Sequence, residues 1–230
     1  LSPEQLWVLK IISIFRTPID SAVLLGIIEH VNPNQFQEES VPKFSSIQLN
    51  QILSRLTDLQ LIYKHQNVRL LPRYSIHPAI SQYFYRALHE DALLLHLGAT
   101  EYLRHQVAPN EFRVPTRAAV RTRGAGLRTR GAVRNRGISK LPKDQYILDL
   151  LEESIYHALK AGKPEQAYRL YKENLGGYAH LGETLGDFMR GQRILAMFLS
   201  PADTAPNYSF KWLEEVRTDY KRYLDAMEPK

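Results

Sequence analysis

The sequence contains no cysteine and no long apolar run. The missing cysteines exclude a disulfide framework, a cysteine-based zinc site and a thiol nucleophile. The longest apolar stretches, "AVLLGII" and "ALLLHLGA", are too short to span a bilayer. No signal peptide is visible, and the chain starts at Leu1 without a methionine. We therefore expect a cytoplasmic chain that makes no membrane contact and is an internal piece of a longer protein.

Motifs of the common enzyme classes are also missing. Lys163 follows Gly162, but a phosphate-binding loop needs a glycine where His157 stands and a serine or threonine where Pro164 stands. No G-x-S-x-G nucleophile elbow is present. We expect no enzyme activity, catalytic residue or bound cofactor in this chain alone.

The scattered acidic and histidine residues do not have the spacing of a metal site. His89 and His96 in "HEDALLLH" are seven residues apart, whereas a zinc-binding helix places its histidines four apart. We therefore predict no metal site and expect both histidines on a solvent-facing helix surface. Neighbouring glutamates are likewise expected in loops or on solvated helix faces: Glu38 and Glu39, Glu152 and Glu153, and Glu214 and Glu215.

The net charge of +6 is concentrated in one segment. Between Arg113 and Lys143 there are eight arginines, two lysines and no acidic residue, and everything else sums to −4. The sequence "RTRGA" occurs twice in this segment, which has few large apolar residues. Such a composition cannot bury enough surface to offset the entropy of ordering, so we predict a mobile insertion over residues 113–143.

This insertion allows two interpretations. An arginine-glycine arm could bind RNA or DNA phosphates through Arg121, Arg123, Arg128 and Arg130. However, the segment contains no aromatic residue on which bases would stack. A solvated linker is therefore the favoured interpretation, and a helical scaffold whose arm captures RNA is kept as an alternative.

The N-terminal part has the pattern of three helices. "SPEQ" predicts a helix start with Ser2 as N-cap, Pro3 at the first helical position and Gln5 completing a capping box. "TPID" should end this helix and begin a second one, and a third should begin near Ser45 or Ser46. The expected inward residues are Leu6, Leu9, Ile12 and Phe15, then Val23, Leu24, Ile27, Ile28 and Val31, then Leu49, Ile52, Leu53, Leu56 and Leu59.

Two short β-prone stretches follow the third helix. "LIYKHQ" and "RYSIHP" flank a turn and predict a β-hairpin. Three helices followed by a hairpin form the winged-helix arrangement, which we predict for residues 1–88. Many winged helices read DNA with the third helix, but here its outward side chains carry a single positive charge. These outward residues are Gln48, Asn50, Gln51, Ser54, Arg55 and Asp58, and the wing adds Lys64, Arg69 and Arg73.

The C-terminal part is predicted to be helical throughout. Residues 89–112 are expected to form a linking helix, and residues 144–230 a series of antiparallel helical hairpins. Gly162 precedes Ala167 by five residues, and Gly186 precedes Gly191 by the same interval. This recurrence is typical of tetratricopeptide-like hairpins, in which a small residue lies where two helices approach closely. The predicted fold class is therefore mainly α, with a winged helix followed by these hairpins.

The order of these parts, together with "YSIHP" at Tyr74–Pro78, resembles the region that follows the ATPase core in STAND-type NTPases, the bacterial relatives of NB-ARC and NACHT receptors. "YSIHP" is similar to the family's Met-His-Asp motif, of which His77 alone is retained. The resemblance implies that His77 contacts the β-phosphate of ADP, held by an upstream NTPase domain. It also implies that the C-terminal helices bind a ligand or a partner protein.

The residues around His77 fit this role independently. Pro78 biases His77 towards an extended backbone and suits the first turn of a helix. The imidazole should therefore sit beside a helix N-terminus, which favours anions. The sequence also leaves open that His77 is a helix cap with no ligand, and that the protein is a DNA-binding transcription regulator whose helical part binds an effector.

Overall fold

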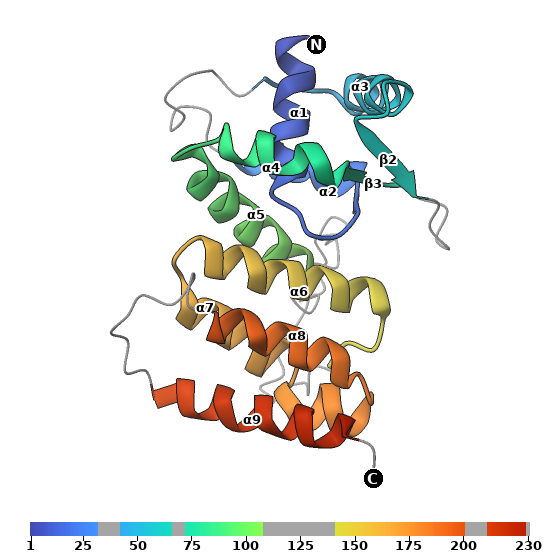
Figure 1. Cartoon of the computed structure of the whole chain (residues 1–230). Helices are drawn as coiled ribbons and strands as arrows, with labels where there is room; N and C mark the ends of the chain where they lie inside the picture. Colours follow the sequence, from blue (N-terminus) through green and yellow to red (C-terminus); the bar gives the residue numbers. More distant parts are fainter. Residues whose placement is uncertain (32–41, 66–71, 108–140, 201–210, 229–230) are drawn as a thin grey trace, which may run out of the picture.

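The computed structural model describes residues 1–31, 42–65, 72–107, 141–200 and 211–228. These residues are mainly helical, with one small antiparallel sheet (Figure 1). The predicted insertion at 113–143 falls almost entirely outside the described residues, as do Glu38, Glu39 and Arg69. No helix among the described residues is long and apolar enough to cross a membrane.

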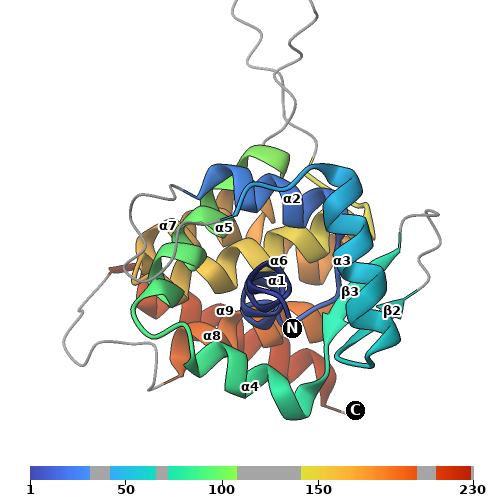
Figure 2. The same ribbon diagram turned by 90° about the horizontal axis from the view of Figure 1, so that it is seen from above.

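The first helix, α1 (Pro3–Ser13), begins as the sequence predicts. Ser2 caps it, the Gln5 side chain completes the capping box, and Pro3 occupies the first turn. The helix contacts α3, α4 and β3, and Figure 2 shows it end-on among them. Because it is covered on several sides, Trp7 and Val8 are buried, whereas Leu6, predicted to face inward, is 37% exposed.

The next elements build the small sheet. β1 (Ile19–Asp20) leads into α2 (Ser21–His30), and α3 (Ser46–Asp58) is followed by β2 (Ile62–His65) and β3 (Arg73–Ile76). The predicted hairpin is present, with Ile62 opposite Ile76. β1 was not predicted; it pairs with β3 through Ile19 and Tyr74 and gives the strand order β1-β3-β2.

Asp20 and Ser45 cap α2 and α3, and the five predicted inward residues of α2 are all buried. In α3, Leu49, Leu53 and Leu56 are buried. Leu59, which was also predicted to face inward, is 42% exposed because it lies at the C-cap, where the helical face ends.

Two helices connect the sheet to the C-terminal part. α4 (Pro78–Arg86) follows β3 directly, and α5 (Asp91–Val107) packs against α2 and α6 (Gln145–Lys160). His96 of α5 meets His157 of α6, while Leu103 and Leu150 line the same small cavity. From His96 to Leu103 the chain advances seven residues along α5, while from His157 to Leu150 it goes back seven residues along α6. The two helices are therefore antiparallel, and Val107 at the end of α5 lies near the start of α6.

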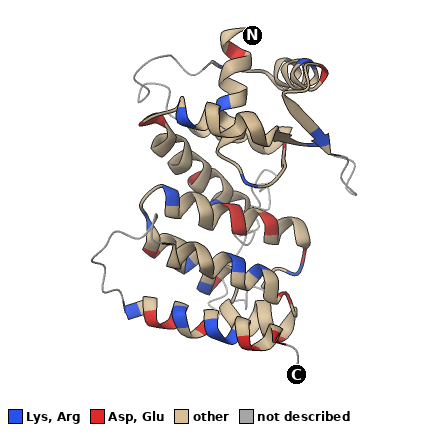
Figure 3. Cartoon of the chain, in the orientation of Figure 1, with Lys and Arg blue, Asp and Glu red and all other residues tan. Residues whose placement is uncertain are grey.

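The remaining elements stack below α6 in Figure 1. They are α7 (Pro164–Arg169), the π-helical segments η2 (Leu170–Asn174) and η3 (Ala179–Thr184), α8 (Phe188–Leu199) and α9 (Lys211–Met227). The outer helix α9 carries basic and acidic side chains along its length (Figure 3). The buried apolar residues form one continuous core from α1 to α9.

The two glycine positions singled out in the sequence have the same conformation. Gly162 and Gly186 both have φ +67°, which suits glycine at a helix end. Five residues after each, Ala167 is fully buried, and a Cβ on Gly191 would overlap the ring of Tyr223. The close helix–helix approach predicted at these small residues is therefore present at Gly191, between α8 and α9, whereas for Ala167 the structure shows burial.

Candidate functional site

His77 lies at the junction of β3 and α4. Its backbone is extended (φ −61°, ψ 127°), and Pro78 occupies the first turn of α4. The backbone N–H of Ala79 donates to the His77 Nδ1 atom over 3.1 Å, so the imidazole is the N-cap of this helix. The extended backbone and the helix start were both predicted, and the capping hydrogen bond agrees with the second interpretation of His77.

This hydrogen bond fixes the tautomer of the ring. An amide N–H donates a proton, so Nδ1 must offer a lone pair and a neutral imidazole carries its proton on Nε2. The side chain is half-buried and lies 5.4 Å from the Tyr63 ring, centroid to centroid. The Ile80 and Ser81 amides donate to the His77 carbonyl. The Nε2–H group is thus the donor that remains on a neutral His77 ring.

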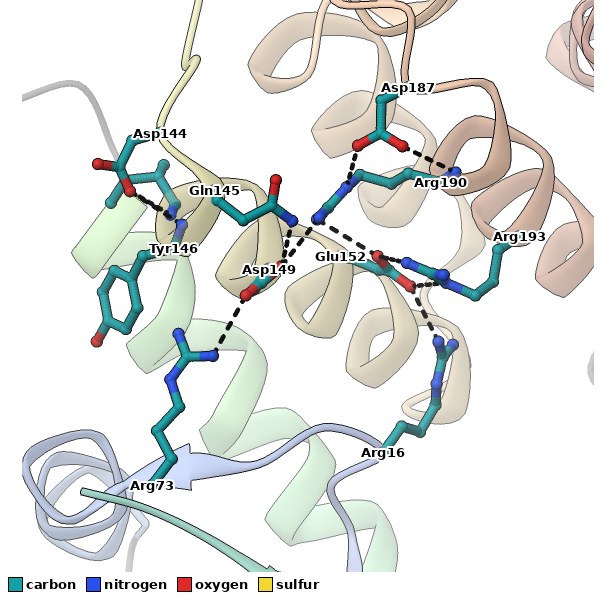
Figure 4. A network of polar contacts seen from close by, with 11 residues as sticks. Arg16, Arg73, Asp144, Gln145, Tyr146, Asp149, Glu152, Asp187, Arg190 and Arg193 are labelled. Carbon is teal, nitrogen blue, oxygen red and sulfur yellow. Dashed lines mark hydrogen bonds and ion pairs between the residues drawn. The ribbon is translucent and has the colours of Figure 1, made fainter. Parts of the chain in front are cut away.

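A second group of polar residues lies between the N-terminal and C-terminal parts (Figure 4). Its centre is Glu152 of α6, which is 2% exposed. Arg193 of α8 donates to both carboxylate oxygens, at 2.6 and 2.7 Å, and Arg16, from the segment after α1, donates at 3.0 Å. Arg190 adds a contact at 3.5 Å. One buried carboxylate therefore links elements from both ends of the chain.

Asp149, one turn before Glu152, makes a similar bridge. It accepts from Arg73 of β3 at 3.3 Å and from Arg190 of α8 at 2.9 Å. Arg190 is 4% exposed and is also held by Asp187, the N-cap of α8, at 2.8 Å. The guanidinium of Arg73 lies over the Tyr146 ring, 4.9 Å from its centroid. These contacts attach the small sheet to α6 and α8.

Tyr146 reinforces the same contact from the start of α6. Its hydroxyl donates to Asp20 over 2.6 Å, and the other oxygen of Asp20 accepts the Val23 amide that caps α2. Burial, together with the neighbouring Asp20 carboxylate, raises the pKa of Tyr146 far above its ordinary value. The phenol therefore remains a proton donor at all physiological pH values.

A third set of titratable residues is buried beside this network. Glu153 is 3% exposed, His157 is fully buried and His96 is 1% exposed. The two histidines are joined Nδ1 to Nδ1 over 2.7 Å, and Nε2 of His157 lies 3.7 Å from Oε2 of Glu153. The Arg16 amide donates to the same oxygen at 3.5 Å.

Burial raises the pKa of Glu153 to about 7, and the Arg16 charge opposes this shift without cancelling it. Burial also lowers the pKa of His157 well below its ordinary value, and the neighbouring His96 and Arg16 add to the effect. Both shifts favour neutral side chains in this part of the core.

Three surface predictions are therefore wrong. Glu152, Glu153 and His96 were expected on solvated faces but are buried, because α6 is covered by α5 on one side and α8 on the other. Arg190 and Arg193 were not selected from the sequence. A usable signal was present: Asp149 and Glu152 on α6 are three residues apart, as are Arg190 and Arg193 on α8. Glu214 and Glu215 do lie on the outer helix α9.

The other predicted residues divide between described and undescribed parts. Arg121, Arg123, Arg128 and Arg130 lie outside the described residues. Within the described ranges, no cluster of three or more potential ligands is arranged to hold a metal ion.

Comparison of the chain with protein-family models, curated proteins and solved structures found no match. The three groups of residues described above are therefore interpreted from their own geometry.

Proposed function

We propose that this chain is the regulatory part of a STAND-type signalling NTPase. In this proposal residues 1–88 are a winged-helix domain that packs on a nucleotide-binding domain, and residues 144–230 are tetratricopeptide-like hairpins that bind a ligand or partner protein. The helix and strand order from α1 to β3, with the sheet order β1-β3-β2, supports the first assignment. The matching Gly162 and Gly186 conformations support the second.

The observation that carries the proposal is the hydrogen bond from the Ala79 amide to Nδ1 of His77, which leaves Nε2–H as the remaining donor of a neutral ring. The Ala79 amide occupies Nδ1, so the ring is held in one orientation and its free donor needs no change of protonation to meet a phosphate oxygen. The N-terminus of α4 adds the positive end of the helix dipole beside the ring. In the resting state His77 donates to the β-phosphate of ADP, and release of ADP frees the C-terminal part to rearrange.

The test is the ADP affinity of a protein in which this chain follows its nucleotide-binding domain. His77→Ala should weaken ADP binding roughly 10-fold to 100-fold, because a hydrogen bond to a charged group contributes about 1.5–3 kcal/mol. His77→Asn is the matched control for folding, since asparagine caps a helix well but does not extend as far as Nε2. It should keep the stability of α4 and still lose ADP affinity.

Equal ADP affinity in all three proteins would contradict the nucleotide contact and leave His77 as a helix cap. The transcription-regulator alternative makes a different prediction. It requires the whole chain to bind duplex DNA with sequence selectivity and a steep salt dependence.

A further inference from the structure

Four titratable side chains form a line from the surface into the core. Tyr85 of α4 is partly exposed, and its hydroxyl lies 3.3 Å from Nε2 of His96. Nδ1 of His96 lies 2.7 Å from Nδ1 of His157. Nε2 of His157 then faces Oε2 of Glu153 at 3.7 Å. Each imidazole thus contacts the preceding group of the line, on the Tyr85 side, with one nitrogen and the following group, on the Glu153 side, with the other.

The line has two consistent arrangements of protons. When Glu153 is ionised, the Tyr85 hydroxyl donates to His96, Nδ1–H of His96 donates to His157, and Nε2–H of His157 points at the carboxylate. When Glu153 is protonated, its O–H donates to Nε2 of His157, and Nδ1–H of His157 donates to His96. Nε2–H of His96 then donates to the Tyr85 oxygen.

The two arrangements differ by one proton, and that proton can be passed along the line. The Tyr85 oxygen takes a proton from water and gives its own to Nε2 of His96. His96 passes the proton on its Nδ1 to His157, and His157 passes the one on its Nε2 to Glu153. Every intermediate group ends neutral with one proton, so the net change is the binding of one solvent proton by Glu153.

We propose that Glu153 is a buried proton-binding site, reached from solvent through Tyr85, His96 and His157, and that binding this proton tightens the contact of α6 with the segment after α1. Protonation removes a charge from a position that is 3% exposed, where the carboxylate accepts from the Arg16 amide over 3.5 Å and from the Thr17 side chain, and burial still outweighs these contacts. The Arg16 guanidinium is directed to Glu152. The proton therefore adjusts how firmly the two parts of the chain hold each other.

The electrostatic surroundings agree with this role. The raised pKa of Glu153 and the lowered pKa of His157 both favour a protonated carboxyl beside a neutral imidazole over a carboxylate beside an imidazolium. The other titratable or charged groups packed around the line are Arg16 after α1, Asp20 at β1, Arg73 of β3, Tyr102 of α5, Tyr146, Asp149, Glu152 and Tyr156 of α6, and Arg190 and Arg193 of α8.

The first test is equilibrium unfolding of the 230-residue chain between pH 6.5 and 8. In the folded state Glu153 keeps its proton until the pH rises to about 7. In the unfolded state the same side chain is already ionised at pH 5, because an ordinary glutamic acid has a pKa of about 4.3. Stability should therefore fall as pH rises, with the unfolding constant increasing about fourfold over this window. Glu153→Gln, which mimics the protonated acid, should remove this increase. Glu214→Gln on the exposed face of α9 should retain it.

Identical pH dependence in the wild type and Glu153→Gln would overturn the proposal. A second test needs no change at Glu153: ¹⁵N NMR of the histidine rings. His157 should carry its proton on Nε2 at pH 8 and on Nδ1 at pH 6, with His96 changing in the opposite sense. The same tautomers at both pH values would also overturn it.

The route is tested separately with Tyr85→Phe, which keeps the ring but removes the hydroxyl. The tautomer change should persist at equilibrium, while the hydrogen-bonded proton between the histidines should exchange with water more slowly. An unchanged exchange rate would show that the proton does not enter through Tyr85.

Discussion

His96 and His157 are 61 residues apart in the sequence, yet their Nδ1 atoms share a hydrogen bond of 2.7 Å in the core. One Nδ1 must donate and the other accept, so the rings cannot both carry a proton there. The contact fixes how α5 crosses α6, and it places a titratable pair where an apolar pair would be expected.

The first prediction concerns acid stability. Because the pKa of His157 is lowered by burial, the folded state binds fewer protons than the unfolded state below pH 6.5. This histidine should reduce stability as pH falls, by up to about 1.4 kcal/mol per pH unit. His157→Gln can still bond to His96 but removes this contribution, so in urea unfolding between pH 5 and 6.5 its stability should fall less, or rise more, than that of the wild type as pH is lowered. The raised pKa of Glu153 acts in the opposite sense in both proteins. His65→Gln on β2 should show the wild-type pH dependence, and the same pH dependence in all three proteins would contradict the assignment.

The second prediction concerns the carboxylate that Arg16 and Arg193 share. Glu152→Ala leaves Arg16 and Arg193 without their common partner and removes one of the carboxylates around the buried Arg190, so it should lower the free energy of unfolding by about 1.5–3 kcal/mol. The matched control is Glu214→Ala, whose exposed pair with Arg217 should contribute less than about 0.5 kcal/mol. Similar losses in both variants, measured by urea unfolding, would show that the buried network adds nothing specific.

The third prediction concerns Gly191. An added methyl group would overlap the Tyr223 ring, so Gly191→Ala should destabilise the chain by about 1–3 kcal/mol. The double variant Gly191→Ala with Tyr223→Leu should cost less than the sum of the two single changes, because the smaller side chain leaves room for the methyl group. Strict additivity in thermal unfolding would argue against this close approach.

The fourth prediction concerns the arginine-rich segment. Val107 ends near the start of α6, so a connection of a few residues would join the antiparallel helices. Replacing residues 113–140 by six glycine and serine residues should leave the unfolding midpoint unchanged or raise stability by about 1 kcal/mol through a shorter loop closure. Any salt-dependent binding of RNA should be lost in the same variant. A large loss of stability would show that the segment is part of the fold.

Much of the local structure could be predicted from the sequence. Ser2, Ser45 and Pro78 mark helix starts through capping chemistry that involves a few adjacent residues. The spacing of leucines and isoleucines on α2 and α3 predicts most of their buried faces, because it too depends only on residues within a few turns of one another. β1 was missed because two residues are too few to show a periodic pattern, and their pairing depends on β3 more than fifty positions later.

The exposure of single polar residues could not be predicted in this way. In the sequence, Glu152, Glu153 and His96 look like polar residues on the solvent-facing side of a helix. Only the packing of the neighbouring helices in the folded structure buries them.

The sequence by itself determined where several helices begin and most of the apolar faces of α2 and α3, since these depend on backbone capping and side-chain spacing within a few turns. The tertiary structure decided which charged side chains are buried and which partners they meet. Glu152 receives arginines from both ends of the chain, and the two histidines come together from separate helices. Such pairings depend on how α5, α6 and α8 stack, because a buried charge is stable only where partners from distant elements compensate its desolvation.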